Sequence, residues 1–259
     1  MNHGMPNLAL FTFSQSIVLF GATVAFAVPG LAKDERLPSE PTEQWEPVPA
    51  VVTVPAETGI PSDAIILFGG DSLEAWEPVK EGGAGWRIEG GAMVVVPESG
   101  KLRTKAPFGD IQLHLEFQTP NPAVGDGQRR GNSGVFFMGL YELQILDSYQ
   151  NPTYVNGQAG AVYKQYAPLV NASRPPGVWQ SYDAVFTAPR FTANGLVETP
   201  AVLTVFHNGV LVQDHVVLKG PTENRGYPAY RPHAAKLPLE LQDHKNPLRF
   251  RNIWARPLR

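Results

Sequence analysis

Residues 111–118 constrain the fold more than any other part of this sequence. Their odd-numbered positions are all apolar and their even-numbered positions are all polar. A repeat of two residues is the repeat of a β-strand with one buried face, whereas a helix would need a period near 3.6. The segment therefore predicts a strand that covers a hydrophobic core on one side and carries polar groups on the other.

Short apolar or alternating runs of the same kind recur along the chain. They lie at 64–68, 86–96, 134–138, 141–146, 182–187, 202–212 and 248–254. Two of them contain hairpin turns, at Gly90-Gly91 and at Asn208-Gly209, because these residues accept the positive φ of tight turns. The 25 glycines and 25 prolines supply frequent breaks between the runs, and no window of helical length keeps a 3.6 period. Many short strands with frequent turns predict an all-β sandwich or jelly roll.

The chain divides into three predicted parts. Residues 1–32 carry an apolar stretch followed by Ala25-Phe26-Ala27, which fits the small-x-small pattern of a cleaved signal peptide. Residues 33–60 are rich in proline and glutamate and predict an extended linker. Residues 61–259 form the predicted domain. We expect an exported protein, periplasmic or extracellular, with a membrane contact only if the N-terminal segment stays uncleaved as an anchor.

Composition excludes several classes of function. The chain has no cysteine, so disulfides, thiolate metal sites and cysteine nucleophiles are excluded. The net charge is −3 and no basic run occurs, which argues against nucleic acid as a partner because that binding needs clustered cations.

The segment from 130 to 148 holds the strongest candidate site. In a strand, Glu142 and Gln144 share one face while the apolar residues between them face the core. A β-bulge after Gln144 would bring Asp147 onto the same polar face. Carboxylates and amides on a sheet face suit the hydroxyls of a sugar, so we expect a small-molecule or oligosaccharide substrate. The alternative is an ordinary solvated outer face.

Other polar and aromatic residues are candidates for the walls of the same groove. Arg130, Asn132 and Ser133 precede the site, and Gly131 and Gly134 predict a kinked entry to the strand. The further candidates, each placed near a predicted strand end or on a predicted polar face, are His114, Glu116, Tyr163, Lys164, Gln242 and His244.

Four stretches of the chain, taken in order, resemble one known family. They are 67–73 with Trp76, 131–134 with 141–147, 160–163 with 175–179, and 238–254. Together they resemble the 3-keto-disaccharide hydrolase family over about residues 65–259. The resemblance implies a single concanavalin-like jelly-roll β-sandwich domain, export from a bacterial cell, and cleavage of glycosides already oxidised to a ketone at C3.

That activity assigns roles to the candidates. A C3 ketone acidifies the hydrogen on C2, and a base that removes it lets the enolate expel the group on C1. Glu142 is the first candidate base and Asp147 the second, with His244 as a further catalytic candidate. Arg130, Asn132 and Gln144 are candidate donors to the enolate oxygen. A divalent cation held by Glu142, Asp147 and His244 is a possible replacement for these donors.

Two other functions stay open. Glu142 and Asp147 could form the carboxylate pair of a retaining β-glycosidase, which needs the two groups ~5–5.5 Å apart. The domain could also be a non-catalytic, lectin-like carbohydrate-binding module, since the sandwich supports binding as readily as catalysis.

Overall fold

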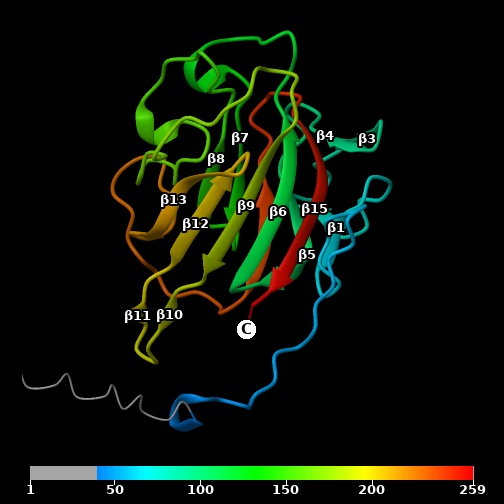
Figure 1. The fold of residues 1–259 in the computed structure, drawn as a ribbon. Coiled ribbons are helices and arrows are strands. Elements are labelled where there is room, and N and C mark those ends of the chain that lie inside the picture. The colour runs from blue at the N-terminus through cyan, green and yellow to red at the C-terminus, as the bar shows by residue number, and fades with distance from the viewer. Residues whose placement is uncertain (1–39, 259) are drawn as a thin grey trace, which may run out of the picture. The chain divides into compact units, whose positions relative to one another are not determined.

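The computed structural model describes residues 40–258, and its regular structure is almost entirely β-strand (Figure 1). Three short 3-10 helices accompany the strands, at Glu40–Thr42, Gly127–Arg129 and Val155–Gly157. The strands are β1 (Ile65–Phe68), β2 (Trp76–Pro78), β3 (Arg87–Glu89), β4 (Ala92–Val94), β5 (Leu102–Phe108), β6 (Ile111–Gln118), β7 (Ser133–Phe137), β8 (Tyr141–Ile145), β9 (Gln180–Thr187), β10 (Arg190–Phe191), β11 (Val197–Thr199), β12 (Val202–His207), β13 (Val210–Val217), β14 (Leu237–Leu241) and β15 (Arg249–Pro257).

Two antiparallel sheets form the body of the domain. The larger runs in the order β13-β12-β9-β6-β15-β4-β3, with β1 paired to β15, and the smaller runs β2-β5-β14-β7-β8. β10 and β11 make a separate two-stranded ribbon. Strands that are distant in sequence are neighbours in both sheets, as expected for a jelly roll. The structure is thus the all-β, concanavalin-like sandwich that the sequence predicts.

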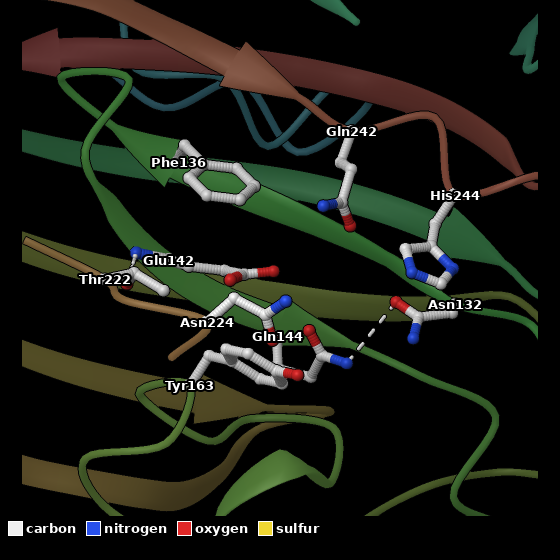
Figure 2. A pocket seen from close by; sticks show the side chains of 9 residues that line it. All are labelled: Asn132, Phe136, Glu142, Gln144, Tyr163, Thr222, Asn224, Gln242 and His244. Carbon is white, nitrogen blue, oxygen red and sulfur yellow. Dashed lines mark hydrogen bonds between the residues drawn. The ribbon is translucent and has the colours of Figure 1, made fainter. Parts of the chain in front are cut away.

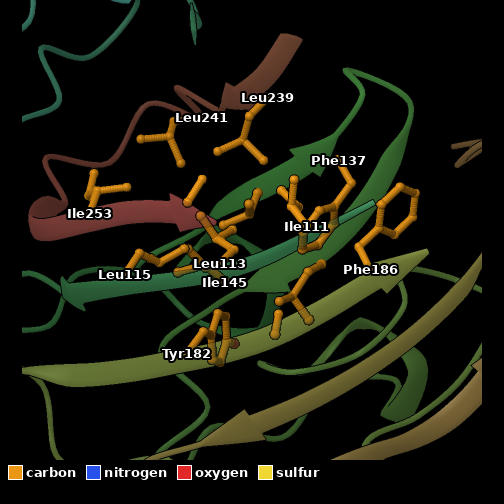
Figure 3. Close-up of a cluster of buried hydrophobic side chains, with 14 of the residues drawn as sticks. Ile111, Leu113, Leu115, Phe137, Ile145, Tyr182, Phe186, Leu239, Leu241 and Ile253 are labelled. Atoms are coloured by element: carbon orange, nitrogen blue, oxygen red, sulfur yellow. The ribbon is translucent and has the colours of Figure 1, made fainter. Parts of the chain in front are cut away.

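The core lies between the two sheets (Figure 3). Phe137 of β7 stacks on Phe186 of β9 with ring centroids 4.7 Å apart, and the hydroxyl of Tyr182 donates a 2.7 Å hydrogen bond to the Gln144 carbonyl. Both contacts join one sheet to the other. Burial of each such aromatic side chain stabilises the fold by roughly 1.5–3 kcal/mol.

The strand pattern of the sequence is confirmed where the alternation is strong. β6 spans 111–118, and its side chains alternate between buried and partly exposed along its whole length. Both hairpin turns are also confirmed, since Gly90, Gly91, Asn208 and Gly209 all have positive φ.

Three strands of the smaller sheet, β2, β5 and β14, escaped the sequence analysis. β5 carries Lys105 and Pro107, which hide its alternation, and β14 falls in a stretch that reads as a polar connection. β14 pairs with β5 on one side and with β7 on the other. Its pairing with β7 begins only at Glu240, so the proline at 238, which lacks an N–H, takes no position in that ladder.

The part of the chain before the sandwich forms a separate unit that ends at Ala50. Within it, residues 41–50 are exposed and contain no strand. The predicted signal peptide lies outside the described residues, and so does the beginning of the predicted linker. Across residues 40–258 the structure contains no helix that is both long and apolar enough to cross a membrane.

Candidate active site

A pocket of about 340 Å³ opens on the outer face of the smaller sheet (Figure 2). Strands β7 and β8 form its floor, and the segments after β13 and β14 form its sides. Nine residues line it, most of them polar: Asn132, Phe136, Glu142, Gln144, Tyr163, Thr222, Asn224, Gln242 and His244.

The register between β7 and β8 decides which side chains reach the pocket. Phe136 pairs with Glu142 and Gly134 with Gln144, so these positions share the outer face. The residues between them, such as Val135 and its partner Leu143, belong to the core. The opposite faces predicted for Glu142 and its apolar neighbours are therefore present in the structure.

Glu142 is a buried carboxyl group, with only 5% of the residue exposed. Burial raises the pKa of this group to about 7, and the charges of Lys101 and Lys164 only partly oppose the effect. Its backbone N–H donates to Thr222 Oγ1 at 2.9 Å, which ties the strand to the segment beyond β13. Glu142 can thus gain and lose a proton near neutral pH.

The side-chain amide of Gln144 lies between two pairs of acceptors. In one orientation its nitrogen is 3.3 Å from Gln128 Oε1. It is also 3.4 Å from Asn132 Oδ1, the contact dashed in Figure 2. In the flipped orientation it donates to Ser133 O and Glu142 Oε1, both at 3.2 Å. Because an ionised carboxylate accepts but cannot donate, ionisation of Glu142 favours the flipped orientation.

Sequence reasoning placed Asn132, Gln144, Tyr163, Gln242 and His244 in the groove, and all five line the pocket with Glu142. The roles predicted for them remain predictions.

Three lining residues were missed: Phe136, Thr222 and Asn224. Phe136 reads as a core residue inside an apolar run. The other two belong to a Pro-Thr-Glu-Asn segment whose only sequence signal is its polarity.

Asp147 lies beyond the end of β8, which stops at Ile145, and its N–H is shared between the Arg130 and Gly131 carbonyls at 3.2 Å each. Its Oδ2 accepts from Arg130 Nε at 2.7 Å and its Oδ1 accepts from the Tyr149 N–H at 3.2 Å. The residue is 1% exposed. Neither Asp147 nor Arg130 lines the pocket, so the placement predicted for these two residues is wrong.

Ser133 also lies outside the pocket. It pairs with Ile145, on the core side of the sheet, and its hydroxyl donates to the Gln242 carbonyl at 2.7 Å. The hydroxyl therefore helps to hold the backbone that carries Gln242, and it does not face the pocket.

The predicted reach of His114 and Glu116 into the same groove is wrong as well. Both lie on β6, whose apolar face packs against the smaller sheet, so its polar face points away from the pocket. There His114 Nδ1 is 2.6 Å from Asp183 Oδ1, and Glu116 forms an ion pair with Arg251 at 2.7 Å. A period of two fixes which residues share a face but not which sheet a strand joins.

The metal ligands suggested by the sequence are not assembled. Glu142 and His244 line the pocket, whereas Asp147 is paired with Arg130. Within residues 40–258 no group of three or more histidine, aspartate or glutamate side chains could hold a metal ion.

A β-sandwich with a carboxyl group and several amides in an outer-face pocket has the polar groups that a sugar-binding site needs. Comparison with known proteins makes this more specific. The sequence profile of the 3-keto-α-glucoside-1,2-lyase-like domain matches residues 63–256, and this chain belongs to that family.

Two crystal structures from Parabacteroides distasonis share the fold, and each is of a protein provisionally named a glycosyl hydrolase. The first is 46% identical, with a TM-score of 0.80, and the match covers 86% of this chain and 97% of the other. The second is 17% identical, with a TM-score of 0.52 over 76% and 94% of the two chains, and supports the fold alone. A separate comparison with curated proteins found no match. Family and fold together identify a carbohydrate-active hydrolase or lyase.

Proposed function

We propose that this protein cleaves the glycosidic bond of 3-keto-glycosides, with Glu142 as the base that removes the C2 proton. One observation carries the proposal: a carboxyl group whose pKa is raised to about 7 by burial faces a sugar-sized pocket. A base is most effective when its pKa lies near the working pH. Membership of a family named for 3-keto-glucoside lyases supports the same chemistry.

The proposed reaction begins when the Glu142 carboxylate takes the proton from C2. The C–H electron pair forms the enolate of the C3 ketone. The enolate then expels the oxygen on C1, which leaves a double bond between C1 and C2 beside the regenerated ketone. The departing oxygen takes up a proton, for which His244 at the exposed end of the pocket is the candidate donor. Addition of water to C1, with a proton returned to C2, completes a hydrolysis.

The surroundings of Glu142 suit this charge movement. Four side-chain amides line the pocket, from Asn132, Gln144, Asn224 and Gln242. Amide N–H groups that are already in place stabilise a developing enolate oxygen without reorganisation. The arrangement gives no support to a retaining glycosidase built on Glu142 and Asp147, because Asp147 is buried in its contact with Arg130.

The rival function is carbohydrate binding without catalysis. The same four amides favour it, since amides bind sugar hydroxyls equally well in a lectin. The two functions differ in what Glu142 does. A binding module needs only its shape and polarity, whereas the lyase needs its ionisation.

The decisive experiment compares a 3-keto-glucoside with the corresponding unmodified glucoside, using the wild-type chain and the Glu142→Gln variant, with and without EDTA. We expect only the 3-keto form to be cleaved, and Glu142→Gln to abolish turnover while binding persists. Cleavage of the unmodified glucoside alone, or binding of either sugar without cleavage, would contradict the proposal. Loss of activity with EDTA would show a metal requirement that the described side chains do not suggest.

A further inference from the structure

Lys164 forms two hydrogen bonds with Asn224, a pocket residue that the sequence analysis did not predict. Its ammonium group donates to the Asn224 carbonyl at 2.6 Å and to the side-chain Oδ1 at 3.0 Å. A lysine donates hydrogen bonds but cannot accept them, so the contact fixes which end of the amide faces it. The nitrogen of Asn224 must therefore point the other way, and Figure 2 shows it directed into the pocket.

Both ends of this contact are anchored to the strand that carries Glu142. The N–H of Tyr163, the residue before Lys164, donates to the Glu142 carbonyl at 3.2 Å. On the other side, Thr222 accepts from the Glu142 N–H at 2.9 Å, two residues before Asn224. The position of the Asn224 amide is thus set relative to the proposed base from two directions.

The backbone of Lys164 supports a specific role for this residue. Its φ is +58°, in the left-handed region that residues with a side chain rarely adopt. This conformation is strained for an L-residue, and such strained positions cluster at functional sites. Here the strained backbone places the ammonium group on Asn224, and the Lys164 N–H itself donates to the Asn156 carbonyl at 2.8 Å.

Asn224 is exposed to solvent, lines the same pocket as Glu142, and donates no hydrogen bond from its amide nitrogen to any of residues 40–258. By contrast, the amide nitrogen of Asn132 already donates to the Gln128 carbonyl at 2.7 Å. A cation on the oxygen of an amide draws electrons from its nitrogen and strengthens the donor, as in other hydrogen-bond chains. Asn224 is therefore an oriented and polarised donor that no described side chain or carbonyl occupies.

We propose that the Asn224 side-chain N–H holds the C3 ketone oxygen as it becomes an enolate, and that Lys164 is a positioning residue that acts through Asn224. This rests on the proposed cleavage of 3-keto-glycosides. The sequence analysis proposed Arg130 as a donor to the enolate oxygen, but Arg130 forms an ion pair with Asp147. We assign the donor role to Asn224 instead. Lys164 contributes without touching the sugar.

The test uses Asn224→Asp beside Asn224→Ala, with kcat and KM measured for a 3-keto-glucoside at each variant's pH plateau. An aspartate keeps an oxygen that can accept from Lys164 but has no side-chain N–H. It therefore removes the proposed donor to the substrate while preserving the contact with Lys164. We expect both variants to lose kcat by about 100-fold, the usual effect of removing one oxyanion donor, with little change in KM. An Asn224→Asp variant with wild-type kcat would overturn the role of Asn224 and leave the proposed function standing.

Lys164 is tested by a double-mutant cycle with Asn224. Lys164→Met should lower kcat by about tenfold in the wild-type background and not at all in the Asn224→Ala background, because coupled residues are not additive. Lys164→Arg should retain activity, since a guanidinium can also donate to both oxygens. Lys105→Met, at an exposed site on β5, is the matched control. An equal effect of Lys164→Met in both backgrounds would show that Lys164 does not act through Asn224. If the wild-type chain cleaves no 3-keto-glycoside, the proposed function itself fails, and this inference fails with it.

Discussion

Gly134 and Glu142 approach so closely that a Cβ added to the glycine would lie 2.6 Å from Glu142 Oε1 and 3.2 Å from Glu142 Cγ. The carboxyl group therefore fills space that no other residue at position 134 would leave open. Gly134→Ala should push the carboxylate out of place and reduce kcat by about 100-fold, because misplacement of a catalytic group by 1 Å costs that much.

Gly85→Ala is the matched control for this substitution, since a Cβ at Gly85 meets no atom within 4 Å. Turnover and thermal unfolding should be measured for both variants. A Gly134→Ala variant with wild-type kcat would show that Glu142 does not act from the observed position.

The activity should depend on pH through Glu142. A base must be ionised to act, so kcat/KM should rise with pH through a midpoint near 7, the value to which burial raises the pKa of Glu142. Lys101 lowers this pKa by its charge. Lys101→Met should therefore move the midpoint to higher pH, whereas the exposed Lys105→Met should not. A profile without a midpoint near neutral pH would argue against Glu142 as the base.

The stability of the fold should contain two opposing pH effects. Glu142 has a pKa of about 7 in the folded protein, against an ordinary value of 4.5. Its contribution to the free energy of unfolding is therefore complete below pH 4.5 and is lost as pH rises through 7. His207 has a pKa lowered to about 4 from an ordinary 6.5, first by burial and then by Arg174. Its contribution is complete above 6.5 and is lost as pH falls towards 4. Each effect amounts to roughly 3 kcal/mol.

Glu142→Gln removes one of these effects and leaves the other. The free energy of unfolding of this variant should rise between pH 4 and 6.5 by roughly 2 kcal/mol more than that of the wild-type chain. Urea denaturation at several pH values measures the difference. Parallel pH dependence of the two proteins would contradict the raised pKa of Glu142.

The buried pair of Asp147 and Arg130 should affect stability and leave the chemistry intact. Asp147→Asn removes the charge that compensates Arg130, and loss of one partner of a buried pair costs about 3–5 kcal/mol. Because Asp147 does not line the pocket, kcat of the folded variant should stay within a few-fold of wild type. Chemical denaturation and turnover measured together test this prediction. A stable but inactive Asp147→Asn variant would restore Asp147 as a catalytic candidate.

The sequence was sufficient for much of the strand pattern. Apolar and polar residues alternate clearly in β6, and the turn at Asn208-Gly209 has a single simple geometry, so both could be predicted locally. Glu142 could be found for the same reason, because a strand places alternate residues on opposite faces. β14 could not be found, since its proline and glutamate resemble a loop until β5 and β7 pair with it.

Which polar groups meet was decided by the tertiary structure. Local alternation predicts a polar face for both His114 and Glu142. Their strands, β6 and β8, belong to different sheets whose outer faces point in opposite directions. Asn224 is more than eighty residues from Glu142 in sequence and enters the pocket only because Thr222 and Lys164 hold its segment there. The sequence by itself determined the strongly alternating strands and the face that each of their residues occupies, because side-chain direction follows from the backbone period. The assembly of the site required the pairing of distant strands and the docking of the segment after β13, which depend on contacts between residues far apart in the chain.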